Sequence, residues 1–160
     1  MELKILTFNT HKFRNPLNRR YILSDLKSTL VDVDCDLILM QELTGVHPQK
    51  VNGTFNGDPL EHLADQLWDH YAYGKNAVST KGHHGNAIMS RHPISTYHNF
   101  NISNHRFEQR GLLHCRIQLD ECYPLDIFTA HLDLSQWGRQ RQLSKLIPII
   151  ERETNGGPFL

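Results

Sequence analysis

The hydrophobic period of this chain changes near residue 70, and this change restricts the fold more than any other feature of the sequence. Five apolar runs of strand length follow, and turns containing Pro, Asn or Asp-Glu separate most of them. Strands joined by such short turns pair antiparallel, because parallel strands need a crossover of a dozen residues or more. The expected strands are 72–78, 86–90, 94–100, 111–119 and 125–131.

Before residue 70 the pattern indicates strands that alternate with helices. Residues 3–8 and 36–42 form apolar runs of strand length, and 21–33 places its leucines and Ile22 on one side of a helix. Another helix is expected over 60–68. Its start is marked by Asp58 at the N-cap, Pro59 at the first helical position and Glu61, which completes a pattern like a capping box.

The last part of the sequence predicts a helix over 137–151, with apolar residues at helical spacing. Pro148 lies inside this pattern and is expected to kink or break the helix, because proline lacks the amide donor and clashes with the preceding turn. Gly156, Gly157 and Pro158 then end the helix, and residues 159–160 resemble the start of another strand.

Length, charge and cysteine content narrow the class of protein. A chain of 160 residues fits one domain, and no apolar run reaches the length of a membrane span. Lys+Arg and Asp+Glu balance at 17 each, which disfavours tight non-specific duplex binding but leaves a nucleic-acid substrate open. The N-terminus shows no signal peptide, and Cys35, Cys115 and Cys122 are odd in number without metal-ligand spacing, which predicts a cytoplasmic protein.

Three polar residues stand where apolar strands end, namely Asn9, Glu42 and His131. Active sites of layered α/β proteins gather at such strand ends. A carboxylate in this setting must be solvated, paired or metal-bound, and a rigid oxygen ligand suits Mg²⁺. Asn9 can orient a phosphate, and His131 can donate to a phosphoryl oxygen. The spacing alone also allows Asn9 to cap a turn, Glu42 to pair with an arginine and His131 to end a surface strand.

Two adjacent histidines, His83 and His84, raise the question of a second metal site. Neighbouring residues on a strand point to opposite faces, so the pair cannot share an ion there. Without a third ligand nearby, the sequence favours a loop at this position.

Four segments together carry a resemblance to a known family: residues 3–9 (LKILTFN), 36–42 (DLILMQE), 85–91 (GNAIMSR) and 129–132 (TAHL). In order and rough spacing they resemble the first four conserved blocks of the endonuclease/exonuclease/phosphatase superfamily. That superfamily includes deoxyribonuclease I, abasic-site endonucleases, sphingomyelinases and inositol-polyphosphate 5-phosphatases. The resemblance covers nearly the whole chain, and within the superfamily it is strongest to a bacterial subgroup of uncharacterised hydrolases.

The resemblance implies catalytic and metal-binding roles for three residues. Asn9 is the active-site asparagine that hydrogen-bonds near the metal and the phosphate. Glu42 is the principal magnesium ligand. His131 is the first of two active-site histidines and contacts the scissile phosphate.

Substrate-binding roles follow from the same resemblance. Asn86 comes after the glycine of the third block and is expected to face the cleft. Arg110 stands where some relatives have a phosphate-contacting arginine. His11 stands where certain relatives have an aspartate near the metal, and this departure leaves the number of metal ions open.

The fold implied by the resemblance is an α+β domain arranged as a four-layer sandwich, in which two packed mixed, largely antiparallel sheets are flanked by helices. Residues 1–160 are then the N-terminal portion of a single domain, and this portion is expected to hold one sheet and little of the second. An uncovered sheet face predicts self-association. High burial is expected for six residues: Ile5, Leu6, Leu37, Leu39, Ile88 and Phe128.

The function implied is Mg²⁺-dependent hydrolysis of a phosphoester, with Mn²⁺ as a substitute ion. Nucleic acid and phospholipid or inositol phosphate both remain open as substrates. Relatives continue into a Gly-Asp-Phe-Asn block, which carries the water-activating aspartate, and a Ser-Asp-His block, which carries the second histidine. The 160-residue chain alone is therefore expected to be inactive, since catalytic residues act as one unit. The alternative is a non-catalytic phosphate- or phospholipid-binding fragment that retains only the fold.

Overall fold

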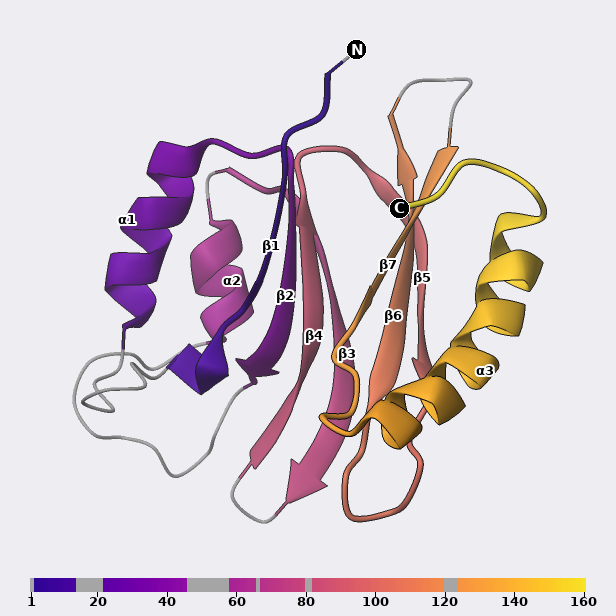
Figure 1. Cartoon of the computed structure of the whole chain (residues 1–160). Coiled ribbons are helices and arrows are strands. Elements are labelled where there is room, and N and C mark those ends of the chain that lie inside the picture. The colour runs from indigo at the N-terminus through magenta and orange to yellow at the C-terminus, as the bar shows by residue number, and fades with distance from the viewer. Residues whose placement is uncertain (1, 14–21, 46–57, 66, 80–81, 120–123) are drawn as a thin grey trace.

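Two β-sheets pack face to face in the computed structural model of this chain (Figure 1), which describes residues 2–13, 22–45, 58–65, 67–79, 82–119 and 124–160. One sheet has the order β1-β2-β4-β3 and the other the order β5-β6-β7. Among the seven strands of the described residues, β1 and β2 are the only pair that runs parallel. The strands are β1 (Ile5–Asn9), β2 (Leu37–Thr44), β3 (His70–Ser79), β4 (Gly82–Ser90), β5 (Ile94–Asn101), β6 (Gly111–Gln118) and β7 (Pro124–Ala130).

Helices cover the outer faces of both sheets, so the chain has four layers (Figure 1). Helices α1 (Leu23–Val33) and α2 (Pro59–Ala64) cover the first sheet, and α3 (Gln136–Thr154) covers the second. Three apolar clusters fill the spaces between the layers, because alternate residues of each strand face opposite sides. This confirms the expected α+β sandwich with mixed, largely antiparallel sheets.

The second sheet is much more complete than expected. Residues 94–130 form three paired strands, and their inward residues Leu113, Cys115 and Ile127 are fully buried against the first sheet. The expectation of one sheet with an uncovered face is therefore wrong. A short turn at residues 91–93 separates β4 from β5 and moves the chain to the second sheet, and a turn of this length is equally compatible with a hairpin.

The burial predictions hold for the central strands and fail at the edge. Leu37, Leu39 and Ile88 are buried, whereas Leu6 and Phe128 are only partly buried. Ile5 is 36% exposed, which contradicts the prediction. It lies on the edge strand β1, opposite Leu37 and on the face that turns toward the second sheet, where the neighbouring layer gives less cover than at the central strands.

The helix signals in the sequence are mostly confirmed, although α2 ends at Ala64 and does not reach the expected residue 68. The Asp58 side chain accepts a hydrogen bond from the Leu60 amide at 2.8 Å, and Pro59 is the first residue of α2. Helix α3 is continuous through Pro148, so the expected break does not occur. No helix in the described ranges is long and apolar enough to cross a membrane. Tyr21, Gln66 and Cys122, on which parts of the sequence predictions rest, lie outside those ranges.

The end of the chain returns to the second sheet after α3. The Leu160 amide donates to the Asp126 carbonyl at 2.9 Å, and the Phe128 amide donates to the Leu160 carbonyl at 2.9 Å. Phe159 bridges Asp126 in parallel. The strand-like ending predicted for residues 159–160 is thus confirmed.

Candidate active site

The candidate site begins at the adjacent carboxyl ends of β1 and β2. Because these strands are parallel and Asn9 is opposite Gln41, the polar residues that end them lie at the same edge of the sheet. Thr10 fixes this edge by donating its amide and its hydroxyl to the Gln41 carbonyl at 2.9 and 3.1 Å. The Asn9 Oδ1 atom accepts from the His11 amide at 2.8 Å, so Asn9 also caps the turn that follows.

That turn has a left-handed backbone, which is uncommon without glycine. His11, Lys12 and Phe13 have φ values of +47°, +58° and +57°. Each costs free energy in this region, and the buried Phe13 side chain holds the turn in place from the core between the helices and the first sheet. Strained backbone of this kind gathers at functional sites, because the surrounding structure must over-determine it. The turn presents His11 and Lys12 at the end of β1.

Glu42 lies in a β-bulge with a left-handed backbone, at φ +55°. Ile38 and Met40 point to the helix-covered face of the sheet, and regular alternation would direct Glu42 to that same face. The register shifts between Met40 and Leu43, however. With the extra residue in the strand, the Glu42 Oε1 atom reaches 3.3 Å from the His131 Nδ1 atom of the opposite sheet. The bulge re-aims the carboxylate into the site.

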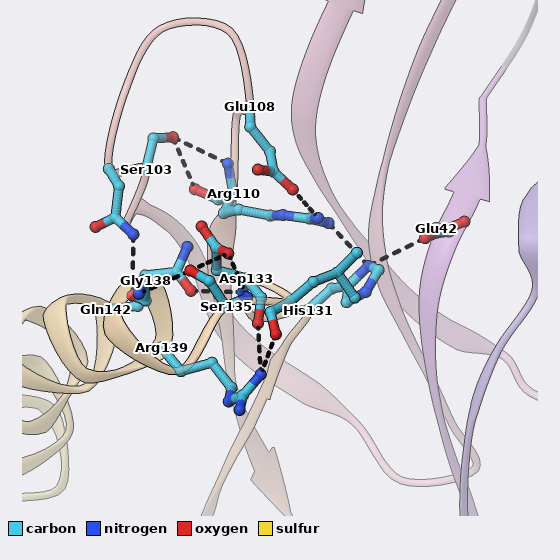
Figure 2. A network of polar contacts seen from close by, with 12 residues as sticks. Glu42, Ser103, Glu108, Arg110, His131, Asp133, Ser135, Gly138, Arg139 and Gln142 are labelled. Carbon is cyan, nitrogen blue, oxygen red and sulfur yellow. Dashed lines mark hydrogen bonds and ion pairs between the residues drawn. The ribbon is translucent and has the colours of Figure 1, made fainter.

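Arg110 completes a polar chain with these two residues (Figure 2). Its Nη1 atom lies 2.9 Å from His131 Nδ1, and Nη2 pairs with the Glu108 carboxylate. The Arg110 side chain is mostly buried, and its Nε atom has no hydrogen-bond partner among the residues that the structure places. The structure therefore brings Glu42, Arg110 and His131 together from β2, from the loop before β6 and from the end of β7.

The pKa of His131 is lowered from the usual value for histidine. Burial is the largest cause, the Arg110 guanidinium lowers the pKa further, and Glu42 opposes them. A lowered pKa keeps the imidazole neutral near pH 7. In the neutral ring that accepts from Arg110 at Nδ1, the proton is on Nε2, where it can be donated to a bound oxygen.

Asn86 lies beneath the site rather than on its surface. It is 1% exposed, and its Nδ2 atom donates to the Gly111 carbonyl at 2.9 Å and to the Thr129 carbonyl at 3.3 Å. These bonds join the first sheet to the second directly beside Arg110 and two residues before His131. Asn86 thus holds both residues in position, while a contact with substrate stays a prediction.

Two residues near the site, Gln41 and His84, were not predicted from the sequence to belong to it. Gln41 precedes Glu42 and donates from Nε2 to the hydroxyls of Thr7 at 3.1 Å and Thr129 at 2.9 Å. His84 lies in β4 rather than in the loop favoured by the sequence. Its pKa is lowered by burial first and then by Lys12, with Glu42 opposing, so it lies within the electrostatic field of the site.

The opposite orientation of the two adjacent histidines explains why only one belongs to the site. His83 Nδ1 is 3.0 Å from the Tyr73 hydroxyl, on the helix-covered side of the sheet. His84 points to the opposite face of the sheet, because successive side chains of a β-strand alternate between its two faces. The signal that could have found His84 is its spacing of two from Asn86 on the same strand.

The loop from His131 to α3 is fixed by hydrogen bonds around Asp133 (Figure 2). Its carboxylate accepts from the Ser135 amide at 2.8 Å and from the Ser135 hydroxyl at 2.9 Å, and these bonds lower the pKa of Asp133. The Asp133 amide donates to Gln142 of α3 at 2.8 Å, and the Ser135 hydroxyl caps the helix by accepting from the Gly138 amide at 3.0 Å. His131 is therefore attached to a rigid helix start.

Two packed sheets between outer layers of helices form the α+β sandwich of the endonuclease/exonuclease/phosphatase fold. The chain belongs to the endonuclease/exonuclease/phosphatase family, whose family model matches residues 6–160. This family is hydrolytic and generally depends on divalent metal ions.

Among curated proteins, the chain is similar to the uncharacterized protein YbhP of Escherichia coli K12, with 39% identity over 161 residues that cover 98% of this chain. YbhP of Shigella flexneri matches to the same extent. The chain spans 64% of the length of these curated relatives.

Solved structures share the fold at low sequence identity. An endonuclease/exonuclease/phosphatase from Beutenbergia cavernae matches with a TM-score of 0.75 and 19% identity, over 91% of this chain and 43% of that one. TDP2 of D. rerio, complexed with a single-strand DNA product, matches with a TM-score of 0.63 and 18% identity, over 98% and 56%. A mannosyl-6-phosphatase of Bacteroides thetaiotaomicron matches with a TM-score of 0.66 and 14% identity, over 97% and 61%.

Proposed function

We propose that this chain carries the metal-binding and phosphate-binding part of an Mg²⁺-dependent phosphoester hydrolase. The observation that most supports this proposal is the distance of 3.3 Å between Glu42 Oε1 and His131 Nδ1. The two residues come from different sheets. A strained bulge directs the carboxylate to that position, and a buried arginine contacts the same histidine. A solvated surface carboxylate would need neither feature.

The residues fit a hard divalent cation. Glu42 pairs with no lysine or arginine among the described residues, and its carboxylate lies there against the His131 ring at 3.3 Å, whose lowered pKa keeps the ring neutral. The carboxylate is 22% exposed and thus keeps a side open to solvent. Mg²⁺ prefers one or two protein oxygens and retains several waters. Glu42 would hold the ion, and Asn9 would contribute its amide oxygen or orient a coordinated water.

The residues of the chain have distinct tasks in this proposal. A bound Mg²⁺ would neutralise charge on the phosphoryl oxygens. Arg110 would pair with the phosphate and keep His131 neutral. His131 would donate its Nε2 proton in a hydrogen bond to a phosphoryl oxygen, which stabilises charge that develops there. His11 would lie beside the substrate, and Asn86 would support Arg110 and His131 from beneath the site.

The substrate class stays open between nucleic acid and a lipid, inositol or sugar phosphate. One structural neighbour holds a single-strand DNA product, and another is a mannosyl-6-phosphatase. Balanced charge weakens the case for a duplex nuclease. We also propose that a longer chain, of the length of the curated relatives, supplies the water-activating aspartate and the second histidine. The free cysteines Cys35 and Cys115 fit the proposed cytoplasmic location.

The test compares Glu42→Gln with the exposed control Glu151→Gln on α3. Hydrolysis of bis-p-nitrophenyl phosphate and p-nitrophenyl phosphate would be measured with Mg²⁺, Mn²⁺ or chelator, for the 160-residue chain and for a chain extended along its reading frame. We expect metal-dependent turnover by the extended chain and a loss of about 100-fold or more in Glu42→Gln alone, since a metal ligand matters at least as much as the groups that orient it. Equal turnover by both variants would remove the metal-ligand role. Metal-dependent phosphate binding without turnover would favour the non-catalytic alternative.

A further inference from the structure

A second group of metal-ligating side chains lies on the outer face of the second sheet, under α3. His98 of β5 and His114 of β6 are direct cross-strand partners, and Glu153 reaches them from the last turn of α3. One ligand atom from each of the three lies within 4.8 Å of the others. The group is separate from the candidate active site, whose loop leads into the first turn of α3.

The buried His114 ring points one nitrogen at this group without a partner. The ring is 2% exposed and stacks on Phe128 with 4.6 Å between centroids. Its Nε2 atom lies 2.7 Å from Asp126 Oδ1, and because a carboxylate only accepts, Nε2 must carry the proton. Nδ1 has no hydrogen-bond partner in the part of the chain that the structure describes, and it faces Glu153 Oε2 at 3.9 Å.

In the neutral ring this arrangement sets two acceptors against each other. The Nδ1 lone pair and a carboxylate oxygen would face one another with no donor between them, which is unfavourable at a buried position. A cation between the two atoms removes the conflict. We propose that His98, His114 and Glu153 bind a divalent transition-metal ion, with Zn²⁺ as the best fit.

The donor set favours zinc over magnesium. Two imidazoles and one carboxylate oxygen form a three-ligand zinc site that leaves the fourth position to water, and Mg²⁺ prefers oxygen alone. His98 is exposed, so solvent reaches that fourth position. Zinc bonds of about 2.0–2.1 Å place tetrahedral ligand atoms roughly 3.4 Å apart. The His114 Nδ1 and Glu153 Oε2 atoms, 3.9 Å apart, are already close to that separation, and all three ligand atoms lie within 4.8 Å of one another.

The surrounding residues orient the ligands as metal sites require. Asp126 holds the His114 ring through Nε2, and Arg116 holds Asp126 with bonds of 2.9 and 3.0 Å. Such carboxylate–histidine pairs fix the tautomer that presents the other nitrogen to a metal. Arg152 binds Glu153 Oε1 at 2.7 Å, which leaves Oε2 facing His114. The bound ion would join the end of α3 to β5 and β6.

The competing account is a doubly protonated His114 that donates to Asp126 and Glu153 and needs no metal. Arg116 and Arg152 already balance these two carboxylates, which lowers their attraction for a further cation. The two accounts differ in the role of His98, because only the metal site needs this exposed side chain.

The experiment is a calorimetric titration of the protein with Zn²⁺ in a saturating Mg²⁺ background, which competes for the Glu42 carboxylate of the candidate active site. Co²⁺ absorption serves as a second readout for tetrahedral nitrogen ligation. The variants are His98→Ala and the matched control His105→Ala, which removes another exposed histidine from the separate group His105, Glu108 and Asp133. Both positions are exposed, so folding should be preserved.

We expect one equivalent of Zn²⁺ to bind to the unaltered protein and to raise its melting temperature by mass action. His98→Ala should weaken this binding by at least about tenfold, while His105→Ala binds as before. Glu153→Gln should weaken it too. Absence of stoichiometric binding, or equal affinity in His98→Ala, would overturn the proposal. Nitrogen chemical shifts that show a doubly protonated His114 unaffected by Zn²⁺ would overturn it as well.

Discussion

Replacing Glu42 with glycine should make the folded chain more stable than replacing it with alanine, because the residue has a left-handed backbone at φ +55°. This conformation costs a residue with a Cβ atom about 1–2 kcal/mol and costs glycine little. The greater freedom of glycine in the unfolded chain offsets about 0.5–1 kcal/mol of that gain. The free energy of unfolding of Glu42→Gly should therefore exceed that of Glu42→Ala by roughly 0.5–1 kcal/mol, which corresponds to a melting temperature about 1–4 °C higher.

The comparison of these two variants isolates the backbone, since both remove the same carboxylate and both should lose metal-dependent turnover. Urea unfolding of each variant gives the free energy of unfolding, and an unchanged m-value shows that the unfolded states are comparable. The control is the same pair at Tyr71, an exposed residue in the regular part of the edge strand β3. There the order should reverse, because glycine weakens an ordinary strand.

The refuting result is a Glu42→Gly variant that is less stable than Glu42→Ala, by the same amount as at Tyr71. It would mean that Glu42 has ordinary strand geometry and that no bulge directs its carboxylate toward His131. The proposed metal-binding position would then lose its structural basis. A gain in stability together with a loss of turnover would instead indicate that the strain is kept for function.

Two further predictions concern the supports of the site. Asn86→Ala removes two buried hydrogen bonds to backbone carbonyls, so urea unfolding should show a free energy of unfolding that is lower by about 2–4 kcal/mol. Asn99→Ala, at an exposed position, is the control and should lower it by less than about 1 kcal/mol. Equal losses in the two variants would contradict the role of Asn86 in joining the sheets. Arg110→Gln removes a cation that lowers the pKa of His131, so NMR titration of this variant should give a higher His131 pKa. The acid limb of its pH–rate profile should move to higher pH. Arg106→Gln is the control and should change neither quantity. Because the folded state resists protonation of His131, the free energy of unfolding should fall as the pH drops through the ordinary histidine pKa. Arg110→Gln should reduce that fall. An unchanged His131 pKa in Arg110→Gln would contradict the electrostatic role of Arg110.

The types and approximate positions of the secondary-structure elements were largely predictable, since each depends on neighbours a few residues away. The period of two marked the five strands after residue 70, and the signals at Asp58 and Pro59 marked the start of α2. Glu42 and His131 were singled out because each follows an apolar run in the sequence, and the resemblance to the family implied that they share a site. The structure places their side chains 3.3 Å apart.

Which sheet a strand joins was not predictable from the same pattern. β4 and β5 belong to different sheets although only a short turn separates them, and nothing in the alternation distinguishes that turn from a hairpin. The partial exposure of Ile5 follows from the edge position of β1, which exists only once the sheets are assembled. His84 was missed because a residue on a strand acquires its neighbours from other strands.

The sequence by itself determined that this chain alternates strand and helix, then runs through successive strands, and that polar residues stand near the ends of three of those strands. The tertiary structure alone decided that Glu42 faces His131. Regular alternation would have directed the Glu42 side chain to the helix-covered face. A bulge in which Glu42 has a left-handed backbone conformation directs the side chain to the opposite face. The residue types do not predict such a bulge, because its backbone strain is offset by packing and hydrogen bonds between segments far apart in the chain.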